Sequence, residues 1–255
     1  MWNDFQTDAA IGIRAEIAEF LGGNGDTVHA YIARPLAEFP RGGVVMLHHM
    51  PGWDEFYQET AERVARHGYD VIVPDLYCRY GHGSPDDMSA KVRTLGGLPD
   101  ASVMADTAAA RDWLRGLSTS NNKVAVMGSC SGGRHAMLAA STVHGLAAVV
   151  DLWGGGVIMS KDQITPARPV APITLTKDVD APVLGLFGND DTSPTPEEVD
   201  LHEAELKKHG KTYEFHRYDG APHAYFCYDR LRYRHEAAMD SWAKIFSFFE
   251  ANLSG

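Results

Sequence analysis

Short apolar runs alternate with amphipathic stretches along most of the chain, and this alternation predicts the fold. The apolar runs lack polar residues at alternate positions, which is typical of strands buried on both faces of a parallel sheet. These runs are 43–48, 69–73, 123–127, 146–152 and 182–187. The stretches with helical spacing are 54–67, 102–116, 131–142 and 196–209. The order predicts an α/β fold with a mostly parallel central sheet and helices on both faces.

The two ends of the chain add a hairpin and a final strand and helix. Segments 14–20 and 27–33 alternate apolar and polar residues around the turn-forming glycines at 22–25, which predicts an N-terminal antiparallel hairpin. Segment 213–218 predicts a further strand, and a helix ending near residue 253 follows it. We expect residues 1–255 to form one domain, because open α/β sheets of this length commonly share a single core.

Charge and cysteine usage exclude several functional classes. The formal net charge of −11 repels a phosphate backbone, so nucleic acid is not an expected partner. The N-terminal segment carries acids, and no apolar run is long enough for a membrane span, so we expect a soluble, cytoplasmic protein. Cys78, Cys130 and Cys227 are widely spaced, which fits neither a disulfide framework nor a metal knuckle.

The sequence KVAVMGSCSGG at 123–133 carries the strongest chemical signal. An apolar strand runs through glycine directly into a helix, which is the pattern of a nucleophile elbow. The backbone is strained at the apex of this turn, and small residues two positions to either side, here Gly128 and Gly132, relieve the crowding. Cys130 is therefore the predicted nucleophile. The structural alternative is an inert buried thiol beside a glycine-rich helix start.

A second register of the same motif has to be weighed. Ser131 also has small residues at the required offsets, Ser129 and Gly133. Because Gly128 directly follows the apolar run, the turn should begin there and place its apex at Cys130. The helix that starts at this point directs free N–H groups and a partial positive charge toward the sulfur.

Two backbone N–H groups are candidates for an oxyanion hole. The N–H of Ser131 follows the nucleophile, and a second donor is expected from the loop after the strand that ends in His48, where Met50 is the candidate.

An acid and a histidine follow the elbow in the order that such a fold requires. Asp190 comes just after the strand at 182–187, and Asp191 is its direct rival. We prefer Asp190, because the earlier residue suits the strand exit. His223 follows the strand at 213–218, where a loop can carry an imidazole over the elbow. His48 and His49 form a pair at another strand exit, but no third ligand has suggestive spacing, so we expect no metal and no cofactor.

The chain resembles the dienelactone hydrolase family along essentially its whole length. The segments that carry the resemblance are GSCSGG around Cys130, HGYDVIVPDLYCR, FGNDDTSP and YDGAPHAYF. The resemblance implies an α/β-hydrolase fold, Cys130 as nucleophile, Asp190 and His223 as its partners, and backbone donors at Ser131 and Met50.

The family's type members open a lactone that bears a carboxylate, which arginines hold, and here the sequence departs from the family. Arg79 matches one arginine position, but the other is Cys227, and nearby Arg230 is the available substitute. His49 stands where the family usually has a glutamate. We expect His49 either to favour a resting thiolate or only to hydrogen-bond a loop backbone.

The expected activity is hydrolysis of an ester or lactone bond in a small molecule through an acyl-enzyme. The alternatives are cleavage of an amide or carbon–carbon bond by the same triad, or a binding protein that retains the fold. The long segments 78–100 and 157–180 are candidate lids, with Tyr80 and Trp153 as substrate-contacting walls or as core residues. The sequence leaves open a monomer or a homodimer.

Overall fold

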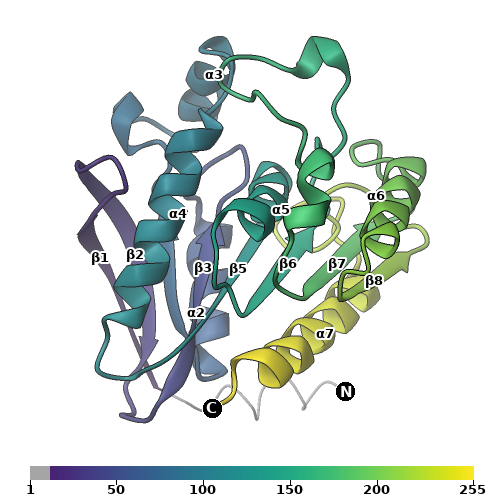
Figure 1. Ribbon diagram of the computed structural model, residues 1–255. Helices are drawn as coiled ribbons and strands as arrows, with labels where there is room; N and C mark the ends of the chain where they lie inside the picture. The colour runs from purple at the N-terminus through teal and green to yellow at the C-terminus, as the bar shows by residue number, and fades with distance from the viewer. Residues whose placement is uncertain (1–11) are drawn as a thin grey trace.

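A computed structural model describes residues 12–255 (Figure 1). The acidic N-terminal segment used above to argue against a secretory signal lies mostly outside the described residues. Within them, one eight-stranded sheet has the order β1-β2-β4-β3-β5-β6-β7-β8. The strands are β1 (Ile13–Leu21), β2 (Thr27–Pro35), β3 (Arg41–Leu47), β4 (Asp70–Pro74), β5 (Ser120–Ser129), β6 (Ala148–Leu152), β7 (Val183–Gly188) and β8 (Tyr213–Tyr218).

The pairing of the strands confirms the predicted α/β fold class. β1 pairs antiparallel with β2, and β2 pairs antiparallel with β4, as the N-terminal hairpin requires. All pairs from β4 through β8 are parallel. β3, β4, β6 and β7 are buried at every residue, which explains why their sequences lack alternation.

Helices cover both faces of the sheet, as predicted. One face packs against α2 (Glu55–Arg66) and α7 (His235–Leu253), and the other against α4 (Asp100–Arg115) and α5 (Ser131–Thr142). α6 (Pro196–Lys208) lies on the same side as α4 and α5, and α2 lies behind the sheet in the view of Figure 1. In the described part of the chain, no helix is long and apolar enough to span a membrane.

Helical elements, among them α3 and η3, lie inside the long segments that the sequence predicts to be loops. α3 (Pro85–Thr94) begins at the N-cap Ser84, whose hydroxyl accepts a hydrogen bond from the backbone of Asp87. Its sequence is mostly polar, and it buries Met88 and Val92 in a small separate cluster, so it has no clear apolar stripe. The 3₁₀ helix η3 (Pro172–Asp178) follows β6. In Figure 1, α3 and the chain that follows β6 lie together at the top of the molecule.

The carboxyl ends of the parallel strands meet at one edge of the sheet and bring the predicted motifs together. The register pairs Leu47 at the end of β3 with Gly128 in β5, and Ser129 with Leu152 in β6. Leu152 in turn pairs with Leu186 in β7. The loops after these strands carry the candidate functional residues, in agreement with the general position of sites in open α/β sheets.

Candidate active site

Cys130 lies at the sharp turn between β5 and α5. Its backbone has φ 54° and ψ −120°, a conformation that is strained for any residue with a Cβ. Its N–H donates a hydrogen bond to the carbonyl of Leu152 in the neighbouring strand, at 3.0 Å. The apex of the turn is therefore at Cys130 and not at Ser131, which is the register that the sequence favours.

Two glycines make the turn possible because backbone passes directly over them. A Cβ on Gly128 would lie 2.1 Å from the carbonyl oxygen of Gly132. A Cβ on Gly132 would lie 1.9 Å from the carbonyl oxygen of Leu47. Both distances are far below van der Waals contact, so a side chain at Gly128 would push the start of α5 away from β5, and one at Gly132 would push it away from β3.

The imidazole of His223 is oriented by Asp191. His223 Nδ1 lies 2.8 Å from Oδ2 and 3.1 Å from Oδ1 of this carboxylate. The Asp191 side chain is buried, and its Oδ1 also accepts a hydrogen bond from the backbone of Ser193 at 2.8 Å. Because the carboxylate holds Nδ1, the other ring nitrogen, Nε2, is available for proton transfer.

The expectation that Asp190 fills this role is wrong. The Asp190 side chain is exposed, and its backbone N–H donates to the carbonyl of Ala221. The chain turns after Gly188, and the N–H of Asp191 closes that turn on the Gly188 carbonyl at 3.4 Å. One additional residue is needed before a side chain points back toward His223.

Cys130 and His223 interact electrostatically. Burial alone would lower the pKa of His223, but hydrogen bonds with Asp191 and Cys130, together with the charges of both groups, raise it to about 10. The buried carboxylate of Asp191 and the neighbouring sulfur of Cys130 therefore favour the imidazolium form of His223.

Trp153 supports His223 from the core. Its ring meets the His223 imidazole edge to face, with centroids 6.5 Å apart, and it also packs against Tyr225 at 5.3 Å. Only 1% of Trp153 is exposed. The structure therefore indicates that Trp153 is a core residue and does not line a substrate pocket.

The two predicted oxyanion donors line one cavity. Ser131 is the first residue of α5, so its N–H has no partner within the helix. Among the described residues, the N–H of Met50 donates no backbone hydrogen bond. The hydroxyl of Tyr77 donates to the Met50 carbonyl at 2.6 Å and thereby fixes that part of the loop. Met50, Tyr77 and Ser131 all line a cavity of about 40 Å³.

Tyr57 in α2 forms hydrogen bonds with the elbow that have no signal in the sequence. Its hydroxyl donates to the carbonyl of Leu47 at 2.8 Å and accepts from the N–H of Ser129 at 3.2 Å. The Ser129 hydroxyl lies 2.8 Å from the same oxygen. One phenol thus ties the end of β3 to the residue before Cys130, a long-range contact that helical periodicity does not reveal.

His48 and His49 form local hydrogen bonds. Nε2 of His48 accepts from the backbone of Leu76 at 3.2 Å, so its Nδ1 carries the proton and donates to the His49 carbonyl at 2.8 Å. Burial lowers the pKa of His48 to about 4, so it is neutral. Nε2 of His49 lies 2.7 Å from Oδ2 of Asp54, a side-chain partner that neither sequence-based expectation for His49 included.

Arg79 does not reach the cavity that Ser131 lines. Its guanidinium forms two paired contacts, with Asp26 at 2.6 and 2.8 Å and with Asp106 at 2.6 and 3.0 Å. These contacts tie the hairpin turn to α4. These contacts occupy the guanidinium, so the structure favours a structural role for Arg79 over the expected role in substrate binding. Tyr80 lies beside Arg79 and lines a different, smaller hollow of about 10 Å³.

We predict that Arg79→Ala lowers the free energy of unfolding by roughly 3 kcal/mol, because Asp106 would remain buried without its cation. Urea denaturation measures this loss. The control Arg14→Ala, which removes an exposed pair with Glu16, should cost less than about 1 kcal/mol. A stable Arg79→Ala protein that loses affinity for acidic substrates alone would contradict the structural role.

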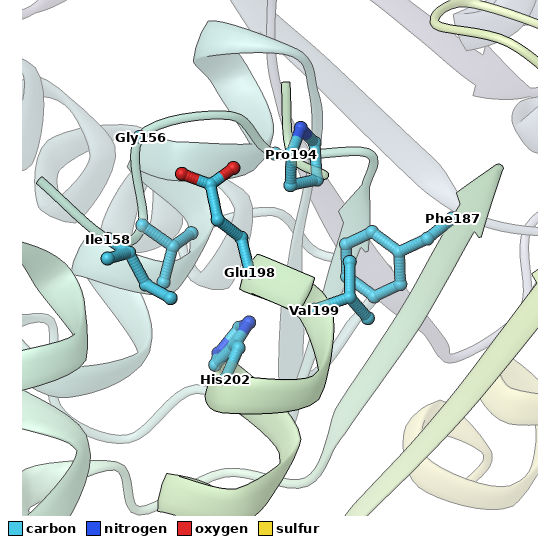
Figure 2. Close-up of a pocket in the computed structure, with 9 residues that line it drawn as sticks. Gly156, Ile158, Phe187, Pro194, Glu198, Val199 and His202 are labelled. Atoms are coloured by element: carbon cyan, nitrogen blue, oxygen red, sulfur yellow. The ribbon is translucent and has the colours of Figure 1, made fainter. Parts of the chain in front are cut away.

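A further hollow lies between α6 and the chain after β6. Figure 2 shows Glu198 and His202 extending from α6 on the side that faces Ile158, and Val199 extending toward Phe187. The hollow has a volume of about 10 Å³, room for one water molecule, and is too small for a substrate. His202 is buried against Phe215, with ring centroids 5.1 Å apart, so it is a core histidine.

Comparisons with known proteins give consistent results. The model of the dienelactone hydrolase family matches residues 28–253. A Yersinia pestis protein assigned as a carboxymethylenebutenolidase is 32% identical over 228 residues, which cover 88% of this chain and 84% of the relative. A Bradyrhizobium protein assigned as a lactonase is 26% identical over 92% of this chain and 94% of its own length. A Klebsiella pneumoniae structure assigned as a dienelactone hydrolase has a TM-score of 0.84 and 29% identity, and the match covers 93% of this chain and 98% of that one.

The sheet, the strained elbow and the histidine–acid pair at the carboxyl edge of the strands define an α/β-hydrolase. Within this class, the chain belongs to the dienelactone hydrolase family, which confirms the resemblance found in the sequence. It is accordingly a hydrolase of carboxylic esters or lactones.

Proposed function

We propose that the protein hydrolyses an ester or lactone bond of a small molecule through Cys130, His223 and Asp191 and a thioester intermediate. The observation that carries this proposal is the strained Cys130 at the elbow, in contact with an imidazole whose Nδ1 is held by a buried carboxylate. A nucleophile, a base and an orienting acid in this order are the minimum that acyl transfer by a cysteine requires.

In the proposed mechanism the thiolate of Cys130 attacks the acyl carbon, and the carbonyl oxygen receives the negative charge. The N–H groups of Ser131 and Met50 would stabilise that oxyanion, since neither has a hydrogen-bond acceptor within residues 12–255. His223 then gives its proton to the leaving alkoxide, and a thioester remains on the sulfur. Water activated by the neutral His223 attacks the thioester, which releases the acid and returns the proton to the imidazole.

Acyl-enzyme trapping tests this proposal. Lactones and aryl esters are mixed with the enzyme, the reaction is quenched in acid within its first turnovers, and the intact mass is measured. We expect one acyl adduct per chain, located on the peptide that contains Cys130, with substrates that are turned over. An adduct on Ser131 would contradict the assignment, as would rapid turnover of amides together with no turnover of any ester or lactone.

A further inference from the structure

The cavity beside the proposed oxyanion donors is also lined by cationic and imidazole side chains. Met50 and Ser131 share its lining with Arg134, His135 and Arg168. Its volume of about 40 Å³ exceeds what one water molecule occupies, so it has room for a small planar group. A substituent in this cavity would lie close to a carbonyl held by the two N–H groups.

Arg134 and His135 contribute no net charge to the cavity. Arg134 is buried and forms a paired contact with the carboxylate of Asp100, at 2.6 and 2.9 Å. His135 is also buried, and burial together with the charge of Arg134 lowers its pKa to about 3, so it is neutral. The Nδ1 atom of His135 and the Nε atom of Arg134 have no hydrogen-bond partner.

Arg168 is the cation of this cavity that remains uncompensated. In residues 12–255, its guanidinium forms no hydrogen bond and no ion pair, and its buried Nε has no partner. Its backbone is nevertheless fixed. The N–H of Arg168 donates to Thr165, the Arg168 carbonyl accepts from Thr165, and Ala167 accepts from Asp100 at 2.8 Å. A positioned guanidinium without an acceptor has its donors available for a ligand.

The two arginines to which the family resemblance pointed, Arg79 and Arg230, are paired with carboxylates. Arg79 is held by Asp26 and Asp106, and Arg230 lies 3.2 Å from Asp229 and 3.8 Å from Asp54. The cavity therefore has a net charge of about one positive unit, located on Arg168. A buried or half-buried cation without a counterion is unfavourable, and a monoanionic group would remove that penalty.

We propose that Arg168 is a specificity-determining residue that binds a carboxylate on the substrate, next to the ester or lactone carbonyl that Cys130 attacks. This proposal rests on the proposed function, since it places the carboxylate relative to the two oxyanion donors. The cationic and imidazole side chains of this subsite come mainly from the segment after β6 and from α5, whereas Arg79, in the segment after β4, does not line the cavity.

The test compares pairs of para-nitrophenyl esters that have equal acyl chain length and differ only in a terminal carboxylate, such as the butyrate and the hemisuccinate. The quantity measured is the ratio of kcat/KM for the acidic and the neutral ester, which cancels any difference in the fraction of folded enzyme. In Arg168→Leu we expect this ratio to fall by roughly tenfold to a hundredfold, the usual effect of losing a charged hydrogen bond. Arg168→Lys should restore part of it.

Arg230→Leu is the matched control, because it removes an arginine that already has carboxylate partners. Its ratio should stay within about twofold of the wild type. If the wild type shows no preference for acidic esters, or if Arg168→Leu keeps the wild-type ratio, the inference is overturned while the proposed function stands.

A binding measurement decides the inference even if no ester is turned over, an outcome that would overturn the proposed function. Succinate and glutarate should raise the melting temperature of Cys130→Ala, and this shift should disappear in Cys130→Ala combined with Arg168→Leu. An equal shift in both proteins would assign the anion to another site and would overturn the role of Arg168.

Discussion

Cys130→Ala is expected to abolish ester and lactone hydrolysis, with kcat/KM reduced at least about 10⁴-fold. The sulfur is the group that would form the covalent bond, whereas the neighbouring donors can only stabilise the oxyanion. The fold should persist, because alanine keeps the Cβ and the backbone N–H that donates to Leu152. Steady-state kinetics measure the loss, and circular dichroism with a thermal melt checks the fold.

Ser131→Ala is the matched control for this experiment. Ser131 adjoins Cys130 and lines the same cavity, but only its backbone N–H enters the proposed mechanism. Its kcat/KM should therefore change by less than about tenfold. An inactive Ser131→Ala together with an active Cys130→Ala would transfer the nucleophile to the serine.

The elbow could be predicted from the sequence because its requirements are local. The glycines that flank Cys130 are needed within five consecutive residues, and the clashes at Gly128 and Gly132 show why nothing larger fits. The sheet could also be predicted, because strands buried on both faces have apolar runs that differ plainly from amphipathic helices. The helix α3 could not be predicted, because its sequence is polar and it buries few residues.

The parts of the site that sequence reasoning missed depend on long-range contacts. Arg79 follows a motif of the family, yet acids 53 residues before it and 27 residues after it take up its guanidinium. Tyr57 contacts Ser129, 72 residues further along the chain. The proposed role of Arg168 depends on the fold, which brings this residue into one cavity with Met50 and Ser131. Such pairings have no signature in the spacing of a single sequence.

The prediction that Asp190, and not Asp191, contacts His223 was wrong for a different reason. Adjacent acids at a strand exit are equivalent in composition and periodicity, and only the length of the turn decides which one points inward. The turn after Gly188 leaves Asp190 exposed and Asp191 4% exposed. A carboxylate in that buried position is stabilised by the cationic His223 and by the N–H of Ser193, so the two groups hold each other in place.

The pairing of His223 also links stability to pH. Its pKa is raised from 6.5 in the free side chain to about 10 in the folded protein, so the folded state binds the proton more tightly. This contribution to stability is complete below about pH 6.5, and it is lost as the pH rises through about 10. In the proposed mechanism His223 gives this proton to the leaving group, so activity should decline over the alkaline part of that range.

Asp191→Asn should reduce kcat/KM by about 10² to 10⁴-fold, because an amide neither stabilises the imidazolium nor fixes its tautomer as a carboxylate does. Losing the carboxylate also removes an interaction that raises the pKa of His223, so the alkaline limit of activity should move to lower pH. Profiles of kcat/KM between about pH 6 and 11 measure both effects around the raised pKa. Asp190→Asn is the matched control at the adjacent, exposed position, and its profile should coincide with that of the wild type apart from a change of less than about threefold. A large loss in Asp190→Asn with a wild-type profile in Asp191→Asn would show that the hydrogen bond between His223 and Asp191 does not serve the reaction.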